Sequence, residues 1–115
     1  MQIPKPTEED KAYFRSVVPV AAGVEVKAMF GNLGAFVNGN MFMGLFGASV
    51  GVRLPPEARE ELLGTDGAGP FGPDERPMGE YVAMPMSWRS DPDSTELWVS
   101  RAFTHVAAMP PKRRK

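Results

Sequence analysis

The sequence predicts a single α+β domain built on an antiparallel β-meander. Its 115 residues suit one domain. Between Val24 and Leu54, apolar residues recur with a period of two and are interrupted by short turns. The implied strands follow one another along the chain instead of alternating with helices. The counts of 12 Gly and 12 Pro favour short elements joined by turns.

Three helices are expected around these strands. The first covers about 7–18, because Thr7 can cap it, acidic residues suit its N-terminal dipole and Pro19 ends it. The second is a short helix over 55–64 that proline opens and glycine follows. The third covers roughly 93–109. Its expected core residues are Trp98, Val99, Ala102, Phe103 and Val106.

Four strands are expected before the second helix, and a fifth after it. Asn38-Gly39 is the strongest hairpin signal, because both residues accept the positive φ of a type I′ turn. A loop rich in Gly, Pro and Asp covers 65–77 and precedes the last strand. The element order is then α-β-β-β-β-α-β-α, with strands at 24–30, 33–37, 40–46, 49–54 and 78–85.

Two-residue turns on either side of the third strand set the expected register. The first turn places Ala35 opposite Phe42, and the second is expected to place Gly44 opposite Arg53. A glycine at that position leaves room beside Phe42 for a guanidinium group or a small ligand.

The third strand is expected to be apolar on both faces, so both faces need covering. The first and third helices would cover one face. Either the 65–77 loop or a second copy of the chain, related by a two-fold axis, would cover the other. The two expected faces are Phe42, Gly44 and Phe46, and Met41, Met43 and Leu45.

Two arginines are the best candidates for a binding site. Arg53 lies in a strand between apolar residues, and Arg76 lies at the entry to the last strand. Either arginine could bind an anion or a small ligand; the alternative is a structural ion pair with Glu80 or Glu25. The expected ligand-binding set is Arg53, Arg76, Gly44, Phe42 and Tyr81.

No catalytic residue, metal site or cofactor is expected. The absence of cysteine excludes disulfides and thiolate nucleophiles. His105 is the only histidine, and no nucleophile or second ligand stands at a recognisable spacing from it. Glu57, Glu60 and Glu61 lie in a helix, where such acids are more often dipole compensation and a solvated face than metal ligands. No Gly-rich phosphate loop is present.

The charge distribution divides the chain into a domain over 1–111 and a basic tail over 112–115. Four of the 13 Lys and Arg residues lie in the tail, which we expect to be disordered, and the remaining body is mildly acidic. Affinity for nucleic acid comes mainly from neutralising phosphates, so direct binding is not expected apart from the tail. No secretory signal or membrane span is visible, and we expect a cytoplasmic protein without membrane contact.

Several motifs, in order along nearly the whole chain, resemble the N-terminal domain of the TfoX (Sxy) family. One difference is Glu75, where the family usually has glycine before an Arg-Pro-Met motif. The matching segments are VKAMFGNLG at 26–34, VNG at 37–39, MF at 41–42, VRLP at 52–55, PF at 70–71, RPM at 76–78, EYV at 80–82, Pro85, VSRA at 99–102 and MPPK at 109–112.

The resemblance implies an α+β fold of the secretion-chaperone-like type, often dimeric, and an association with regulation of natural competence in some bacterial members. The second, helical domain of full-length competence regulators does not follow, so we expect a stand-alone single-domain member. We therefore expect a non-enzymatic regulatory module that forms a homodimer and acts through contacts with a protein partner. The alternative is a small-ligand or anion-binding domain that uses Arg53 and Arg76.

Overall fold

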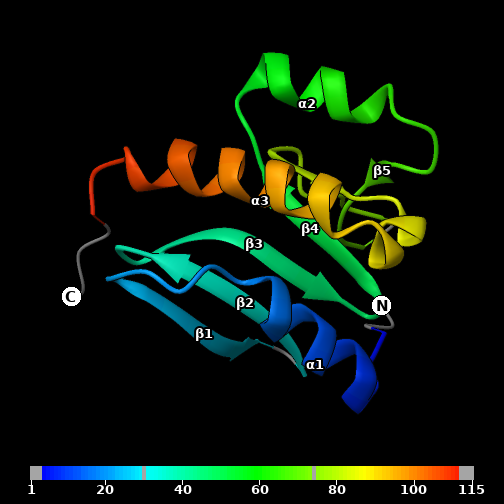
Figure 1. Cartoon of the computed structure of the whole chain (residues 1–115), viewed down its shortest axis with the longest axis horizontal. Coiled ribbons are helices and arrows are strands. Elements are labelled where there is room, and N and C mark those ends of the chain that lie inside the picture. Colours follow the sequence, from blue (N-terminus) through cyan, green and yellow to red (C-terminus); the bar gives the residue numbers. More distant parts are fainter. Residues whose placement is uncertain (1–3, 30, 74, 112–115) are drawn as a thin grey trace.

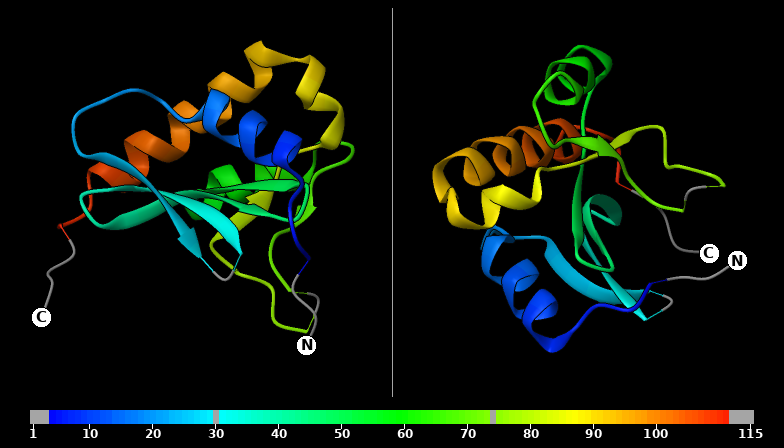
Figure 2. Two further views of the ribbon diagram at one scale, coloured as in Figure 1. Left: turned by 90° about the horizontal axis from the view of Figure 1, so that it is seen from below. Right: turned by 90° about the vertical axis from the view of Figure 1, so that its right-hand side faces the viewer.

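A twisted antiparallel sheet separates a layer of helices from a long loop in the computed structural model, which describes residues 4–29, 31–73 and 75–111 (Figures 1 and 2). Within these residues the sheet has six strands in the order β1-β2-β3-β4-β6-β5. The elements are α1 (Glu8–Val17), β1 (Val24–Met29), β2 (Asn32–Val37), β3 (Asn40–Phe46), β4 (Ser49–Arg53), α2 (Pro56–Leu63), β5 (Gly69–Pro70), β6 (Tyr81–Ala83), the 3₁₀ helix η1 (Met86–Ser90) and α3 (Pro92–Ala107).

The predicted α+β class and the meander of β1 to β4 are confirmed. Asn38 and Gly39 have φ of 53° and 83°, as a type I′ turn requires. The fifth predicted strand, at 78–85, is shortened to β6, because the N–H of Tyr81 donates to the Met78 carbonyl at 3.0 Å and closes a turn before the strand begins. The short strand β5 and the helix η1 were not predicted. The basic tail at 112–115 lies outside the described residues.

The helices cover one face of the sheet. The view along the sheet shows α1, α3 and η1 on one side and the 64–80 loop on the other (Figure 2). The helix α2 lies beside α3, and Arg101 of α3 pairs with Glu61 of α2 at 3.2 Å. Among the helices of the described residues, none has both the length and the apolarity that crossing a membrane requires.

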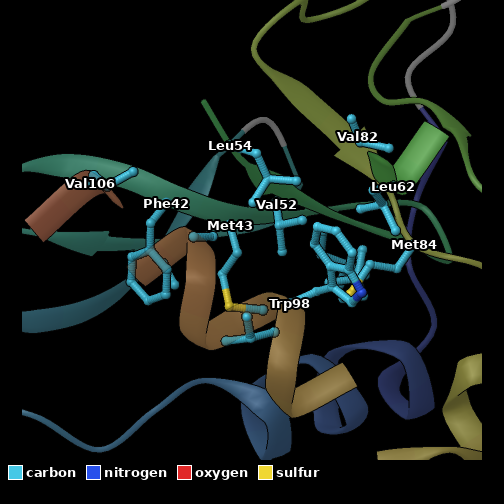
Figure 3. Packing of buried hydrophobic residues seen from close by; sticks show 14 of the residues in the cluster. Phe42, Met43, Val52, Leu54, Leu62, Val82, Met84, Trp98 and Val106 are labelled. Carbon is cyan, nitrogen blue, oxygen red and sulfur yellow. The ribbon is translucent and has the colours of Figure 1, made fainter. Parts of the chain in front are cut away.

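The main hydrophobic core lies between the sheet and α3. Phe42, Met43, Val52 and Leu54 project from β3 and from β4 and its end toward this helix (Figure 3). The ring of Phe42 is fully buried and meets Phe103 edge-on, with 5.4 Å between centroids. Burying each such side chain contributes about 1.5–3 kcal/mol to folding. The core therefore holds α3 firmly against one face of the sheet.

A β-bulge in β3 corrects the register predicted between the second and third strands. Phe36 pairs with Met41, but Ala35 pairs with Met43, so Phe42 is the extra residue and does not lie opposite Ala35. A bulge interrupts the alternation of side chains, and both Phe42 and Met43 are fully buried on the helix face. Beyond the bulge the predicted face sets are wrong: Met41, Gly44 and Phe46 share the opposite face.

The predicted pairing of Gly44 with Arg53 is also wrong. The turn at 47–48 has two residues, so Phe46 pairs with Ser49 and Gly44 pairs with Gly51. Arg53 lies two residues further along β4 and pairs with Tyr81 of β6. The expected slot between Gly44 and Arg53 is therefore not formed, and Gly44 faces another glycine.

Candidate functional site

Three glycines form a row across the centre of the sheet. Gly34 of β2 pairs with Gly44 of β3, and Gly44 pairs in turn with Gly51 of β4. Ala83 of β6 continues the row. Because glycine has no side chain, the row is a shallow trough on the sheet face that the helices leave uncovered, where another group can approach the backbone closely.

The ring of Phe71 fills one end of this trough. Ring atoms of Phe71 lie where a Cβ at Gly51 would be, and 3.3 Å from the position of a Cβ at Gly44. The ring is also bordered by Phe46 and Tyr81, with centroids 6.2 Å and 6.0 Å away. As a result Phe71 is only 3% exposed, although it belongs to a loop.

The loop that carries Phe71 is fastened by backbone hydrogen bonds. Pro70 of β5 pairs with Val82 of β6. The N–H of Met78 donates to the Phe71 carbonyl at 2.8 Å, which closes the loop over the sheet. The loop therefore covers part of this sheet face, as one of the two predictions for it required.

Methionine side chains cover the other end of the trough. The sulfur atoms of Met41 and Met29 lie 2.8 Å and 2.9 Å from the position of a Cβ at Gly34, and Cε1 of the Phe36 ring lies 3.1 Å from it. Methionine is unbranched, flexible and polarisable, so thioethers adapt their packing more readily than rings do. The two thioethers at the Gly34 end can therefore move aside, whereas the edge of the Phe36 ring borders this end.

An apolar groove of about 330 Å³ opens between these methionines and the Phe71 loop. Asn32 is the one polar residue in its lining, and its side chain is engaged: Nδ2 donates to the Pro4 carbonyl at 3.1 Å, and Oδ1 accepts from the Gly47 N–H at 2.8 Å. The remaining lining residues are Met29, Leu33, Met41, Gly44, Leu45, Phe46, Phe71, Pro73 and Met78. The groove therefore suits an apolar group and no charged one.

Arg53 forms an ion pair rather than facing a ligand slot. Its Nη2 atom lies 3.0 Å from Oε1 of Glu80, one of the two partners considered for a structural pair. Its Nε is buried and has no hydrogen-bond partner among the described residues. The guanidinium is thus partly satisfied, at the margin of the sheet.

The five predicted ligand-binding residues do not converge on one point. Gly44 and Tyr81 both adjoin Phe71, and the Tyr81 hydroxyl donates to the Met41 carbonyl at 2.8 Å. Burial raises the pKa of Tyr81, so this hydroxyl stays protonated. Phe42 lies on the opposite face of the sheet. Arg76 is exposed in the loop, and no described hydrogen bond or ion pair joins it to the other four.

His105 is half-buried on α3. Burial lowers its pKa, and the nearby positive charges of Arg53 and Arg59 act in the same direction. Among residues 4–29, 31–73 and 75–111, no group of three or more His, Cys, Asp or Glu side chains is placed to hold a metal ion.

Most of the groove was missed from the sequence. Gly44 was singled out, but with the wrong cross-strand partner. A usable signal existed, because one glycine in each of three consecutive strands falls in register once the turn at 47–48 is read correctly. No local signal placed Phe71, since its position depends on a contact between segments distant in sequence.

The fold and the groove define a class of small α+β domain with an apolar recess on the helix-free face of its sheet. The family described as TfoX N-terminal domain matches residues 16–106, and the chain therefore belongs to this family. No curated protein matches the chain.

Proposed function

We propose that this chain is a non-enzymatic regulatory module that binds a partner protein through the apolar groove. The observation that carries the proposal is the trough of three glycines, which is filled at one end by Phe71 and covered at the other by movable methionines. Membership of the TfoX N-terminal domain family supports the regulatory setting.

The occupant we propose is an extended segment of the partner with an aromatic side chain. Phe71 supports this choice, because its ring already uses the same glycine row as a platform and is almost completely buried there. A second ring placed over Gly34 would displace the Met29 and Met41 thioethers and rest beside the edge of the Phe36 ring. Buried aromatic anchors of this kind dominate the energetics of many protein interfaces.

Selection of peptides from a random display library tests the proposal directly. Peptides enriched on the wild-type protein should carry a Trp, Phe or Tyr residue. They should bind the groove variant Met41→Glu at least about tenfold more weakly, because a carboxylate in a desolvated groove is costly. Met86 is 50% exposed outside the groove, so Met86→Glu is the matched control and should bind normally.

Two results would contradict this function. The first is enrichment of peptides without aromatic residues. The second is enrichment of peptides that bind Met41→Glu as well as they bind the wild type. Unfolding curves for both glutamate variants establish that the compared proteins are folded.

A second candidate function, binding of an anion or small ligand through Arg53 and Arg76, is supported by one observation. The buried Nε of Arg53 has no partner in the described part of the chain, and the paired Glu80 is 57% exposed and able to swing away. If this function holds, phosphate should raise the melting temperature of the wild type, and less so that of Arg53→Met and Arg76→Ala. An equal effect on all three proteins would contradict it.

A further inference from the structure

Within the described part of the chain, the first strand, β1, forms one edge of the sheet. Among the described strands, β1 occupies the end of the strand order and pairs with β2 alone (Figure 1). One of its edges therefore carries backbone N–H and C=O groups for which the described residues supply no strand partner. Residues 25–28 are exposed, so side chains do not cover this edge either.

We propose that β1 pairs antiparallel with β1 of a second copy of this chain, about a two-fold axis that passes beside Val26. This contact would join the two sheets into one continuous sheet. It uses the outer edge of β1, whereas β1 contributes Met29 to the groove on the sheet face, and it does not depend on the proposed function of the groove.

Charge complementarity selects this register. Glu25 and Lys27 flank Val26 and lie on the same face of the sheet, opposite in sign and two residues apart. With Val26 opposite the partner's Val26, each Glu25 lies opposite the partner's Lys27. Two cross-strand pairs of opposite charge result, and such pairs stabilise antiparallel strands.

The neighbouring registers are disfavoured. A two-fold axis normal to the sheet keeps every side chain on its own face. The register can therefore change only if the axis moves from Val26 to another residue of β1. An axis beside Glu25 would place Glu25 opposite the partner's Glu25, and an axis beside Lys27 would place two lysines opposite each other. Like charges directly opposite destabilise the pair.

The other face of β1 also complements itself in this register. Val26 is 37% exposed at the margin of the helix face, beside the buried Ala35 of β2. Pairing would bring Val26 against the partner's Val26, and Val24 against the partner's Ala28. One register therefore satisfies the charges on one face and covers exposed apolar side chains on the other.

Sedimentation equilibrium at low salt, with single and combined charge reversals, tests this inference. The wild type should dimerise, and Glu25→Lys or Lys27→Glu alone should weaken dimerisation by about tenfold or more, because two attractive pairs become repulsive. Mixing these two variants should form a heterodimer, and the double reversal in one chain should restore the homodimer. Glu60 and Lys5 are exposed elsewhere, so Glu60→Lys and Lys5→Glu are the matched controls and should leave the wild-type dimer intact.

A wild type that stays monomeric through the millimolar range would overturn the inference, as would a dimer that both single reversals leave intact. Formation of the heterodimer on mixing shows that both single variants are folded. If both variants are folded and no heterodimer forms, this result also contradicts the Val26 register. These outcomes are independent of the display experiment, which concerns the groove.

Discussion

Gly51 lies directly beneath the ring of Phe71, so close that a Cβ on Gly51 would overlap the ring. The two residues are 20 positions apart. Among the described glycines, Gly51 leaves the least room for a Cβ, and this lack of a side chain lets the loop approach the strand closely. The contact positions the loop over the sheet and thereby forms one wall of the groove.

Substitution of Gly51 tests how much this contact matters for stability. Gly51→Ala should lower the free energy of unfolding by about 1–3 kcal/mol, because the methyl group forces the Phe71 ring out of its place. Gly69 is the matched control: it lies in β5, and its Cβ would meet no atom within 4 Å. Urea unfolding should therefore show a much smaller change for Gly69→Ala. Equal effects at the two glycines would contradict the packing of Phe71 on Gly51.

Removal of the Phe71 ring should show that the contributions of Gly51 and Phe71 to stability are coupled. Phe71→Ala should cost about 3–5 kcal/mol, since it removes a buried aromatic side chain. In the Phe71→Ala background, however, Gly51→Ala should cost little, because the overlapping ring is gone. A double-mutant cycle measures this coupling. Additive costs would mean that Gly51 is constrained by something other than Phe71.

Substitution of Arg53 should have little effect on stability. Its ion pair with Glu80 lies at the protein margin, where such pairs contribute about 0–1 kcal/mol, and Arg53→Met also removes the unpartnered Nε. Chemical unfolding of Arg53→Met should differ from wild type by no more than about 1 kcal/mol. A loss above about 2 kcal/mol would show that the guanidinium supports the fold more strongly than its contacts indicate.

Asp10 should make stability depend on pH in the acidic range. The backbone N–H of Thr7 donates to its carboxylate, and Arg89 lies 2.9 Å away; both hold the pKa of Asp10 below its ordinary value. The stabilisation is therefore fully present above the ordinary pKa of about 3.9 and is lost as the pH falls through the lowered value.

The difference in stability between Asp10→Ala and the wild type should therefore decrease as the pH falls. The melting temperature of the variant should be lower at pH 7, and the difference should shrink below about pH 4. Glu9→Ala, in the same first turn of α1 but exposed, is the control for helix effects. A difference that stays constant down to pH 2 would contradict the role of the ionised carboxylate.

Where local chemistry decides the structure, the sequence predicts it correctly. Thr7 caps α1 as predicted, and Asn38-Gly39 forms the predicted hairpin, because both depend on residues close in sequence. The alternation in 24–54 was enough to define four meandering strands. These features needed no knowledge of contacts between distant segments.

The predictions that failed depended on contacts between elements. The bulge at Phe42 left no mark in the sequence, because β3 is apolar on both faces and a shift of one residue keeps an apolar pattern. Phe71 was in a predicted loop, and its burial follows from glycines in β3 and β4. The predicted binding residues around Arg53 do not lie together either, because the bulge places Phe42 on the other face of the sheet.

In the function that we propose, the glycine row forms a platform for an aromatic group at its Gly34 end. The most direct test is to titrate the protein with indole and follow the methionine methyl signals by NMR. We predict shifts at Met29 and Met41, none at Met86, and loss of the shifts when Gly34→Leu fills the platform. Shifts at Met86 instead, or shifts that persist in Gly34→Leu, would contradict the claim.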